Sequence, residues 1–130
     1  MSAGNVALVR GIYHDFARGD VPAVLAALDP EVQWVENAFT VHHVTHVGPG
    51  AVASQVFGAV MSRFDDFAVV PESIYDAGEH VVVEGRVTGT TKDGRALDAP
   101  AAWVWTVRGG KAVRNMNYHD TSAWQQALGS

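Results

Sequence analysis

The 130-residue sequence contains no cysteine, little positive charge and no long apolar run. Without cysteine it offers no disulfide framework, no thiolate nucleophile and no thiolate metal ligand. Nine lysines and arginines stand against fourteen acidic residues, for a formal net charge of -5. The basic residues are scattered, so the basic patch that nucleic-acid binding needs is missing. No apolar stretch approaches the roughly 20 residues of a membrane span, and the N-terminus lacks a signal-peptide pattern. We therefore expect a cytoplasmic protein that binds neither nucleic acid nor membrane.

What the sequence does contain is a large share of core-forming residues. It is 48% hydrophobic and includes four tryptophans. A chain of this length and composition can bury a real core. We expect a single domain over residues 1–130.

Hydrophobic periodicity gives the order of the secondary structure. Helical spacing predicts helices over residues 6–18, 21–28 and 51–64. Alternation and turn signals predict strands over residues 31–37, 67–76, 81–91, 101–108 and 112–120. The last two strands would meet at a tight turn at Gly109 and Gly110, and residues 123–128 would add a helical turn. Residues 38–50 fit neither period and are predicted to form a loop or lid. The expected fold is α+β, with a strongly curved mixed sheet wrapped as a cone around three helices.

Six short motifs occur in a characteristic order along this layout. They are A-R-G-D at 17–20, W-V-E at 34–36, G-P-G-A-V at 48–52, V-V-V-E-G-R-V-T-G-T at 81–90, V-W-T-V-R-G-G-K at 104–111 and Y-H-D-T at 118–121. Together they resemble the SnoaL-like polyketide cyclases and ketosteroid isomerase relatives of the nuclear transport factor 2-like superfamily. The resemblance implies a cone with a hydrophobic cavity, a small apolar ligand and a homodimer. One such fold hosts several enzyme activities as well as non-catalytic binders.

The resemblance to ketosteroid isomerases points to Glu36 as a catalytic residue. An ungapped alignment from Gly19 and Asp20 places Glu36 at the position of the isomerase's proton-shuttling aspartate. The positions of the two isomerase oxyanion donors fall on Ile12 and Trp103. Steroid isomerisation is therefore not expected. Glu36 could instead be an exposed strand carboxylate.

The resemblance to SnoaL-like cyclases points to Asp120, through a Tyr-x-Asp-Thr pattern. The resemblance to the isomerases implies that His119 and Asn115 point into the cone, and strict alternation would then turn Asp120 outward unless a bulge reverses this. Both residues are therefore catalytic candidates. Asp120 could also cap the terminal helical turn, and His119 could be a hydrogen-bonded core residue.

A second set of residues is expected to line the substrate site. Aromatic and amide side chains could wall an apolar pocket with a few fixed polar groups, although the aromatic residues would also fill any core of this size. The expected substrate-binding residues are Phe16, Trp34, His46, Phe57, Met61, Trp103, Asn115 and Asn117.

Three histidines between residues 38 and 50 raise the question of a metal. His42 and His46 would share a face of an extended segment while His43 would not, and no acidic neighbour other than Glu36 completes a set. We expect no metal here. No Gly-rich phosphate loop follows a strand, so no cofactor is expected either.

The leading hypothesis is a cofactor-independent acid/base enzyme of the cyclase, isomerase or hydratase type. Glu36 or Asp120 would remove a proton next to a carbonyl of an apolar, polyketide-like substrate, with His119 and Asn117 as donors to the enolate oxygen. The alternative is a non-catalytic module that binds a small ligand or only dimerises; a protein-interaction domain is a third possibility. A homodimer would pack through the outer sheet face, by Met116 and Tyr118 or by Ala102 and Val104, according to the register.

Overall fold

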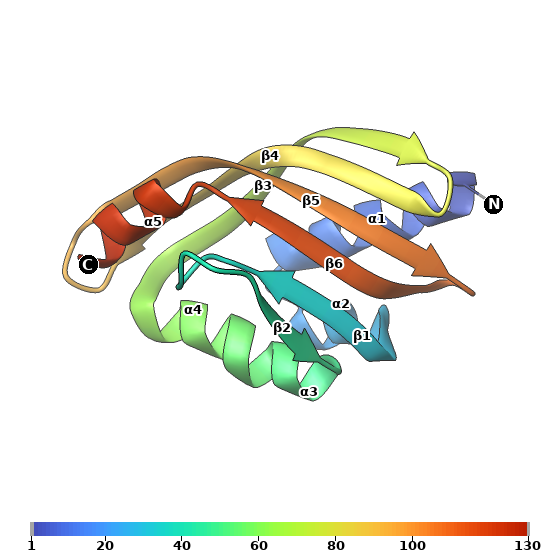
Figure 1. Ribbon diagram of the computed structural model, residues 1–130, viewed down its shortest axis with the longest axis horizontal. Helices are drawn as coiled ribbons and strands as arrows, with labels where there is room; N and C mark the ends of the chain where they lie inside the picture. Colours follow the sequence, from blue (N-terminus) through green and yellow to red (C-terminus); the bar gives the residue numbers. More distant parts are fainter. Residues whose placement is uncertain (1, 130) are drawn as a thin grey trace.

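A single curved sheet organises the structure, a computed structural model that describes residues 2–129 (Figure 1). Its strand order is β2-β1-β6-β5-β4-β3. β1 and β6 run parallel, and the other neighbouring pairs are antiparallel. The strands are β1 (Leu28–Glu36), β2 (Val44–Val47), β3 (Phe64–Ala77), β4 (His80–Thr91), β5 (Ala96–Arg108) and β6 (Lys111–His119). The mixed, curled sheet confirms the predicted α+β fold, and β3 to β6 form the predicted meander.

Helices enclose the inside of this curved sheet. They are α1 (Ser2–Ala17), α2 (Val21–Ala26), α3 (Pro49–Ala51), the π-helical segment η1 (Val52–Phe57), α4 (Gly58–Arg63) and α5 (Thr121–Leu128). α1 packs against β3 and β4, α3 against β1, and α5 against β5 near the C-terminal end of the sheet (Figure 1). In the described part of the chain, no helix has the length and apolar character needed to cross a membrane.

Strand register aligns large side chains on the inner face. Trp34 of β1 lies beside Asn115 of β6, which lies beside Trp105 of β5. The next inner pair along β6 and β5 is Asn117 and Trp103. All five residues are buried. Period-two alternation thus places two tryptophans of β5 and two asparagines of β6 in one layer.

The segment predicted as a loop contains a strand. β2 pairs antiparallel with the end of β1, so that Val44 lies opposite Glu36 and His46 opposite Trp34. β2 is short and forms an edge of the sheet, and three of its four residues are exposed. It therefore has neither the length nor the one-sided burial that would mark a strand in the sequence.

Other boundaries move by a few residues. The helix predicted over 51–64 begins at Pro49, includes a π-helical turn and ends before Phe64, which starts β3. β5 begins at Ala96 rather than at 101, and β6 ends at His119 rather than at 120. The turn at Gly109 and Gly110 is confirmed, with φ values of 57° and 76° that glycine adopts readily.

Candidate active site

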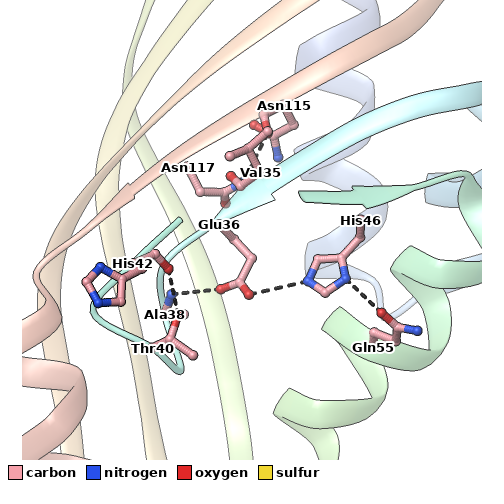
Figure 2. Close-up of polar contacts among 9 residues, drawn as sticks. All are labelled: Val35, Glu36, Ala38, Thr40, His42, His46, Gln55, Asn115 and Asn117. Carbon is pink, nitrogen blue, oxygen red and sulfur yellow. Dashed lines mark hydrogen bonds and ion pairs between the residues drawn. The ribbon is translucent and has the colours of Figure 1, made fainter. Parts of the chain in front are cut away.

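Glu36 is a buried carboxylate at the C-terminal end of β1. Glu36 is 7% exposed. A charged side chain buried to this degree needs hydrogen-bonding or charged partners. The backbone N–H of Ala38 donates to Oε2 at 2.7 Å. The other oxygen, Oε1, faces the ring of His46 (Figure 2). One carboxylate oxygen is therefore fixed by the backbone, and the other is directed to a group that can exchange a proton.

His46 connects this carboxylate to the π-helical segment. Its Nε2 lies 3.5 Å from Glu36 Oε1, and its Nδ1 lies 2.9 Å from Gln55 Oε1 (Figure 2). Because the amide oxygen of Gln55 only accepts, Nδ1 carries a proton in this arrangement. A hydrogen bond between Nε2 and Glu36 then requires a second proton, held either by the imidazole or by the carboxyl group. Glu36 and His46 thus form a pair able to hold and pass one proton.

β6 contributes two amides beside Glu36. The Asn117 amide donates from Nδ2 to Val35 O at 3.0 Å and to Asn115 O at 3.3 Å. Asn115 is 0% exposed, and neither its Oδ1 nor its Nδ2 has a hydrogen-bond partner among residues 2–129. The indole Nε1 of Trp34, its register neighbour, is also buried without a partner. Asn117 therefore holds the strand ends together, while Asn115 and Trp34 keep unused hydrogen-bonding capacity inside the cone.

Tyr13 brings a phenol into the same interior from α1. Its hydroxyl oxygen accepts a hydrogen bond from Trp105 Nε1 at 3.0 Å. Burial raises the pKa of Tyr13 well above its ordinary range, against the smaller lowering effect of that bond. The phenol is therefore protonated at neutral pH, and its own hydrogen remains available to a further acceptor.

Aromatic rings surround these polar groups in edge-to-face contacts. The ring centroids of Trp34 and Trp105 are 5.6 Å apart, and those of Trp34 and Phe57 are 5.5 Å apart. Phe16 contacts Phe57 at 5.4 Å, and Tyr13 contacts Trp103 at 5.7 Å. Such contacts exclude water and strengthen the electrostatic interactions among the groups they enclose.

His119 and Asp120 lie on opposite sides of the sheet end. From the Thr106–Arg114 pair to the Ala101–His119 pair the β5–β6 register has no shift, so His119 lies on the inner face with Asn115 and Asn117. Its ring contacts Trp124 at 5.3 Å and Trp103 at 6.2 Å. Burial, helped by the nearby charge of His43, lowers the pKa of His119 to about 4. His119 is thus a neutral imidazole at pH 7.

Asp120 is exposed and acts as the N-cap of α5. Its Oδ1 accepts from the backbone N–H of Ala123 at 3.1 Å. This arrangement matches the structural role that the sequence left open for Asp120. The side chain is at the surface, so the structure does not bring it to Glu36.

Of the remaining expected lining residues, Met61 lies outside. It is 64% exposed, whereas the preceding residue, Val60, packs on the core. The helical spacing shared with Phe57 suggested an inward position, but the inner face of α4 is taken by Val60. Phe16, Trp34, His46, Phe57, Trp103, Asn115 and Asn117 are buried or half-buried.

The three histidines of residues 38–50 separate in space. His46 faces Glu36, whereas His42 is exposed and His43 lies with Nε2 2.9 Å from Asn117 O and its ring beside Tyr118. Across residues 2–129, no three histidine, cysteine or acidic side chains gather as a metal-binding group.

Two grooves open on the outside of the molecule. One, of about 410 Å³, lies between the start of β5 and α5, lined by residues that include Leu97 and Ala127. The other, of about 500 Å³, lies on the outer sheet face, lined by residues that include Glu72, Glu84 and Tyr118. Neither groove is lined by Glu36 or His46.

Three residues of the site were not singled out in the sequence. Tyr13 falls within the helix predicted over residues 6–18, and its phenol is a polar signal that the sequence shows. Gln55 falls within the helix predicted over residues 51–64, where no pattern sets it apart. Asn37, which is buried and accepts from the His119 backbone N–H at 3.1 Å, has no sequence signal beyond its place after W-V-E.

Comparisons with known proteins agree with this fold. The family model of the SnoaL-like domain matches residues 9–115. The chain therefore belongs to the SnoaL-like family. A comparison with curated proteins found no match.

Solved structures similar to this chain share its fold over nearly the full length. A nuclear transport factor 2-like protein of unknown function from Burkholderia pseudomallei is 28% identical, with 98% of each chain covered and a TM-score of 0.88. A protein proposed to be a polyketide cyclase, from Xanthomonas campestris, is 25% identical, with 97% of each chain covered and a TM-score of 0.78. TerC, co-crystallised with polyporic acid, is 24% identical, covers 98% of this chain and 99% of its own, and has a TM-score of 0.85.

Proposed function

We propose that this SnoaL-like protein is a cofactor-independent acid/base enzyme acting on a small apolar carbonyl compound. The observation that carries the proposal is the buried Glu36–His46 pair, with Nε2 3.5 Å from Oε1. A structural carboxylate at this depth would be expected to find a fixed cationic partner or several backbone donors. Glu36 instead faces the imidazole of His46, a partner with which a general base can operate.

The proposed reaction begins with removal of a hydrogen from the carbon next to the carbonyl. Glu36 takes the proton at Oε1, and the electron pair of the broken C–H bond moves to the carbonyl oxygen to form an enolate. Tyr13 O–H and Trp34 Nε1–H are the interior donors proposed to stabilise that oxygen. His119, also an expected donor, would act as a neutral imidazole.

The second half-reaction decides the overall chemistry. In an isomerisation, Glu36 returns the proton to a different carbon. In a ring closure, the enolate carbon attacks a second carbonyl of the same molecule, and the new alkoxide takes the proton from Glu36. Both sequences balance without an added oxidant or cofactor.

The comparisons support an apolar, polyketide-like substrate. The similar Xanthomonas campestris protein is proposed to be a polyketide cyclase. TerC was crystallised with polyporic acid. The aromatic interior of this chain, with Trp34, Trp105 and Phe57 in contact, suits the same kind of ligand.

A non-catalytic binding module is the second candidate. It is favoured by the presence of Ile12 and Trp103 at the two positions where the isomerases carry their oxyanion donors. A binder would retain a ligand among the same aromatic rings without exchanging its hydrogens.

We also propose a homodimer formed through the outer sheet face. Tyr75 is 50% exposed and Tyr118 48% exposed on that face, with no helix covering them in the described chain. An uncovered apolar face of this kind favours association.

Hydrogen–deuterium exchange tests the enzymatic proposal before the natural substrate is known. The probe is 2-tetralone, an apolar bicyclic ketone, incubated with the protein in D₂O. Mass spectrometry then follows deuterium entering next to the carbonyl. Catalysed exchange that depends on Glu36 supports the enzyme, whereas binding without exchange supports the module.

A further inference from the structure

Asn115 is the most deeply buried polar side chain of the cone interior. It is 0% exposed, and both amide atoms lack hydrogen-bond partners among residues 2–129. Buried amides in folded proteins are nearly always hydrogen-bonded, because an unmade bond costs stability. Such an exception calls for a functional explanation.

Asn115 has a tryptophan beside it on each of the two neighbouring strands. Trp34 of β1 and Trp105 of β5 are its register neighbours, and both are buried. Trp105 Nε1 is already engaged with Tyr13, but Trp34 Nε1 has no partner in the described chain. Asn115 and Trp34 together thus offer one amide acceptor, the amide N–H donors and one indole donor.

An amide carries its donor and its acceptor side by side in one plane. The ligand that satisfies both must carry an acceptor next to a donor, as a carbonyl with a hydroxyl on the adjacent carbon does. A ketone alone would satisfy only the donor and leave Asn115 Oδ1 unpaired.

We propose that Asn115 recognises a vicinal hydroxy-ketone group of the substrate. The amide Nδ2–H donates to the ligand carbonyl, and the ligand hydroxyl donates to Oδ1. This inference rests on the proposed function, because it takes the cone interior as the substrate site, and it narrows the substrate to oxygenated carbonyl compounds.

The position of Asn115 relative to Glu36 sets the length of the substrate. Asn115 of β6 lies beside Trp34 of β1. Trp34 precedes Glu36 by two residues, so both lie on the same face of β1. Two strand residues span about 6.6 Å. A substrate held at Asn115 therefore needs a second, enolisable carbonyl further along, directed to Glu36. This requirement favours a multiply oxygenated ring or chain.

Phe57 lies near Asn115, on the ring of its register neighbour Trp34. It is half-buried, contacts Trp34 at 5.5 Å and Phe16 at 5.4 Å, and ends the π-helical segment η1. π-helical turns are rare and occur often at functional sites.

A pair of matched probes tests the inference by binding alone. The probes are 2-hydroxy-1-phenylethanone and acetophenone, which differ by the hydroxyl group. NMR titration follows the Asn115 side-chain NH₂ and the Trp34 indole N–H signals. We expect the hydroxylated probe to shift both signals and to bind about tenfold more tightly, the effect of one added hydrogen bond in a dry site.

Two variants complete the experiment. Asn115→Leu keeps the size of the side chain and should bind both probes equally. Glu36→Gln should keep the tenfold preference, because it changes the base and not the recognition group. Deuterium exchange is measured separately from probe binding. Exchange tests the acid/base proposal and binding tests this inference, so a failure of one can be told apart from a failure of the other. Equal binding of the probes by the unmodified protein, no binding of either, or a preference that persists in Asn115→Leu would overturn the inference.

Discussion

His46 Nε2 lies 3.5 Å from Glu36 Oε1, and the two side chains are 10% and 9% exposed. An exposed ion pair at this distance would contribute little, but a pair shielded from water keeps most of its interaction. The geometry joins β1, β2 and η1, three elements that are not continuous in sequence. The account of function depends on this relationship.

Gln55 is expected to hold His46 in the orientation that serves Glu36. Removing its amide oxygen in Gln55→Leu frees the ring, and the loss of one net hydrogen bond of about 1 kcal/mol should slow exchange roughly fivefold. The nitrogen chemical shifts of the His46 ring should change at the same time, which a purely structural role would not produce.

Ser54→Ala is the matched control for Gln55. Ser54 is exposed on the same π-helical segment and donates to Gly50 O. It should leave both rate and ring shifts unchanged. A Gln55→Leu variant with unaltered ring shifts would show that the contact does not orient His46.

Asn115→Leu is expected to stabilise the protein. The substitution removes two buried, unpartnered amide atoms from a fully buried position. The gain in free energy of unfolding should be about 1–2 kcal/mol, measured by denaturant titration.

Asn117→Leu should have the opposite effect. Its amide donates to Val35 O and Asn115 O, so the substitution removes two buried hydrogen bonds. We expect a loss of about 1–3 kcal/mol. If both leucine variants destabilise the protein equally, the distinction between the hydrogen-bonded amide of Asn117 and the unpartnered amide of Asn115 is wrong.

His119 should make stability depend on pH in the mildly acidic range. Its folded pKa of about 4 lies below the ordinary value of 6.5, so the unfolded chain binds more protons between these values. The contribution is fully present above pH 6.5 and is lost as pH falls toward 4, by about 3 kcal/mol in total.

Melting temperatures at stepped pH check this prediction. His119→Phe, which keeps an aromatic ring against Trp124, should flatten the slope between pH 6.5 and 4. His14→Gln serves as the control, because His14 is exposed on α1. A slope that survives in His119→Phe would assign the acid sensitivity to other groups.

The proposed dimer predicts a particle of twice the 13.9 kDa chain mass in light scattering at micromolar concentration. Tyr118→Arg places a charge on the outer face and should yield monomers, with the far-ultraviolet circular dichroism unchanged. A monomeric mass for the unmodified protein would contradict the proposal.

Much of the fold could be predicted because local patterns determine it. Period-two alternation along β6 correctly placed Asn115, Asn117 and His119 on one shared face, although it did not decide whether that face is the inner one. The glycine pair at 109 and 110 correctly marked the last hairpin. Both signals involve residues close in sequence, where side-chain direction follows directly from backbone geometry.

The rest depends on packing between distant segments. β2 is too short and too exposed to show a pattern, yet it brings His46 to Glu36. The contact of His46 with Gln55 depends on how η1 lies against β2, which no spacing reveals. Asp120 carried two opposing signals, a family motif and a capping preference, and only the end of β6 at His119 shows which geometry it adopts.

The central claim is that Glu36 removes a proton from a carbonyl substrate, and α-hydrogen exchange in D₂O tests it most directly. Glu36→Gln keeps size and hydrogen bonding but removes basicity, and Glu31→Gln removes an exposed carboxylate from the same strand. With 2-tetralone as probe, the account predicts that Glu36→Gln lowers the rate of deuterium incorporation at least about a hundredfold, while Glu31→Gln retains it. Equal rates for Glu36→Gln and the unmodified protein, or no catalysed exchange in either, would contradict it.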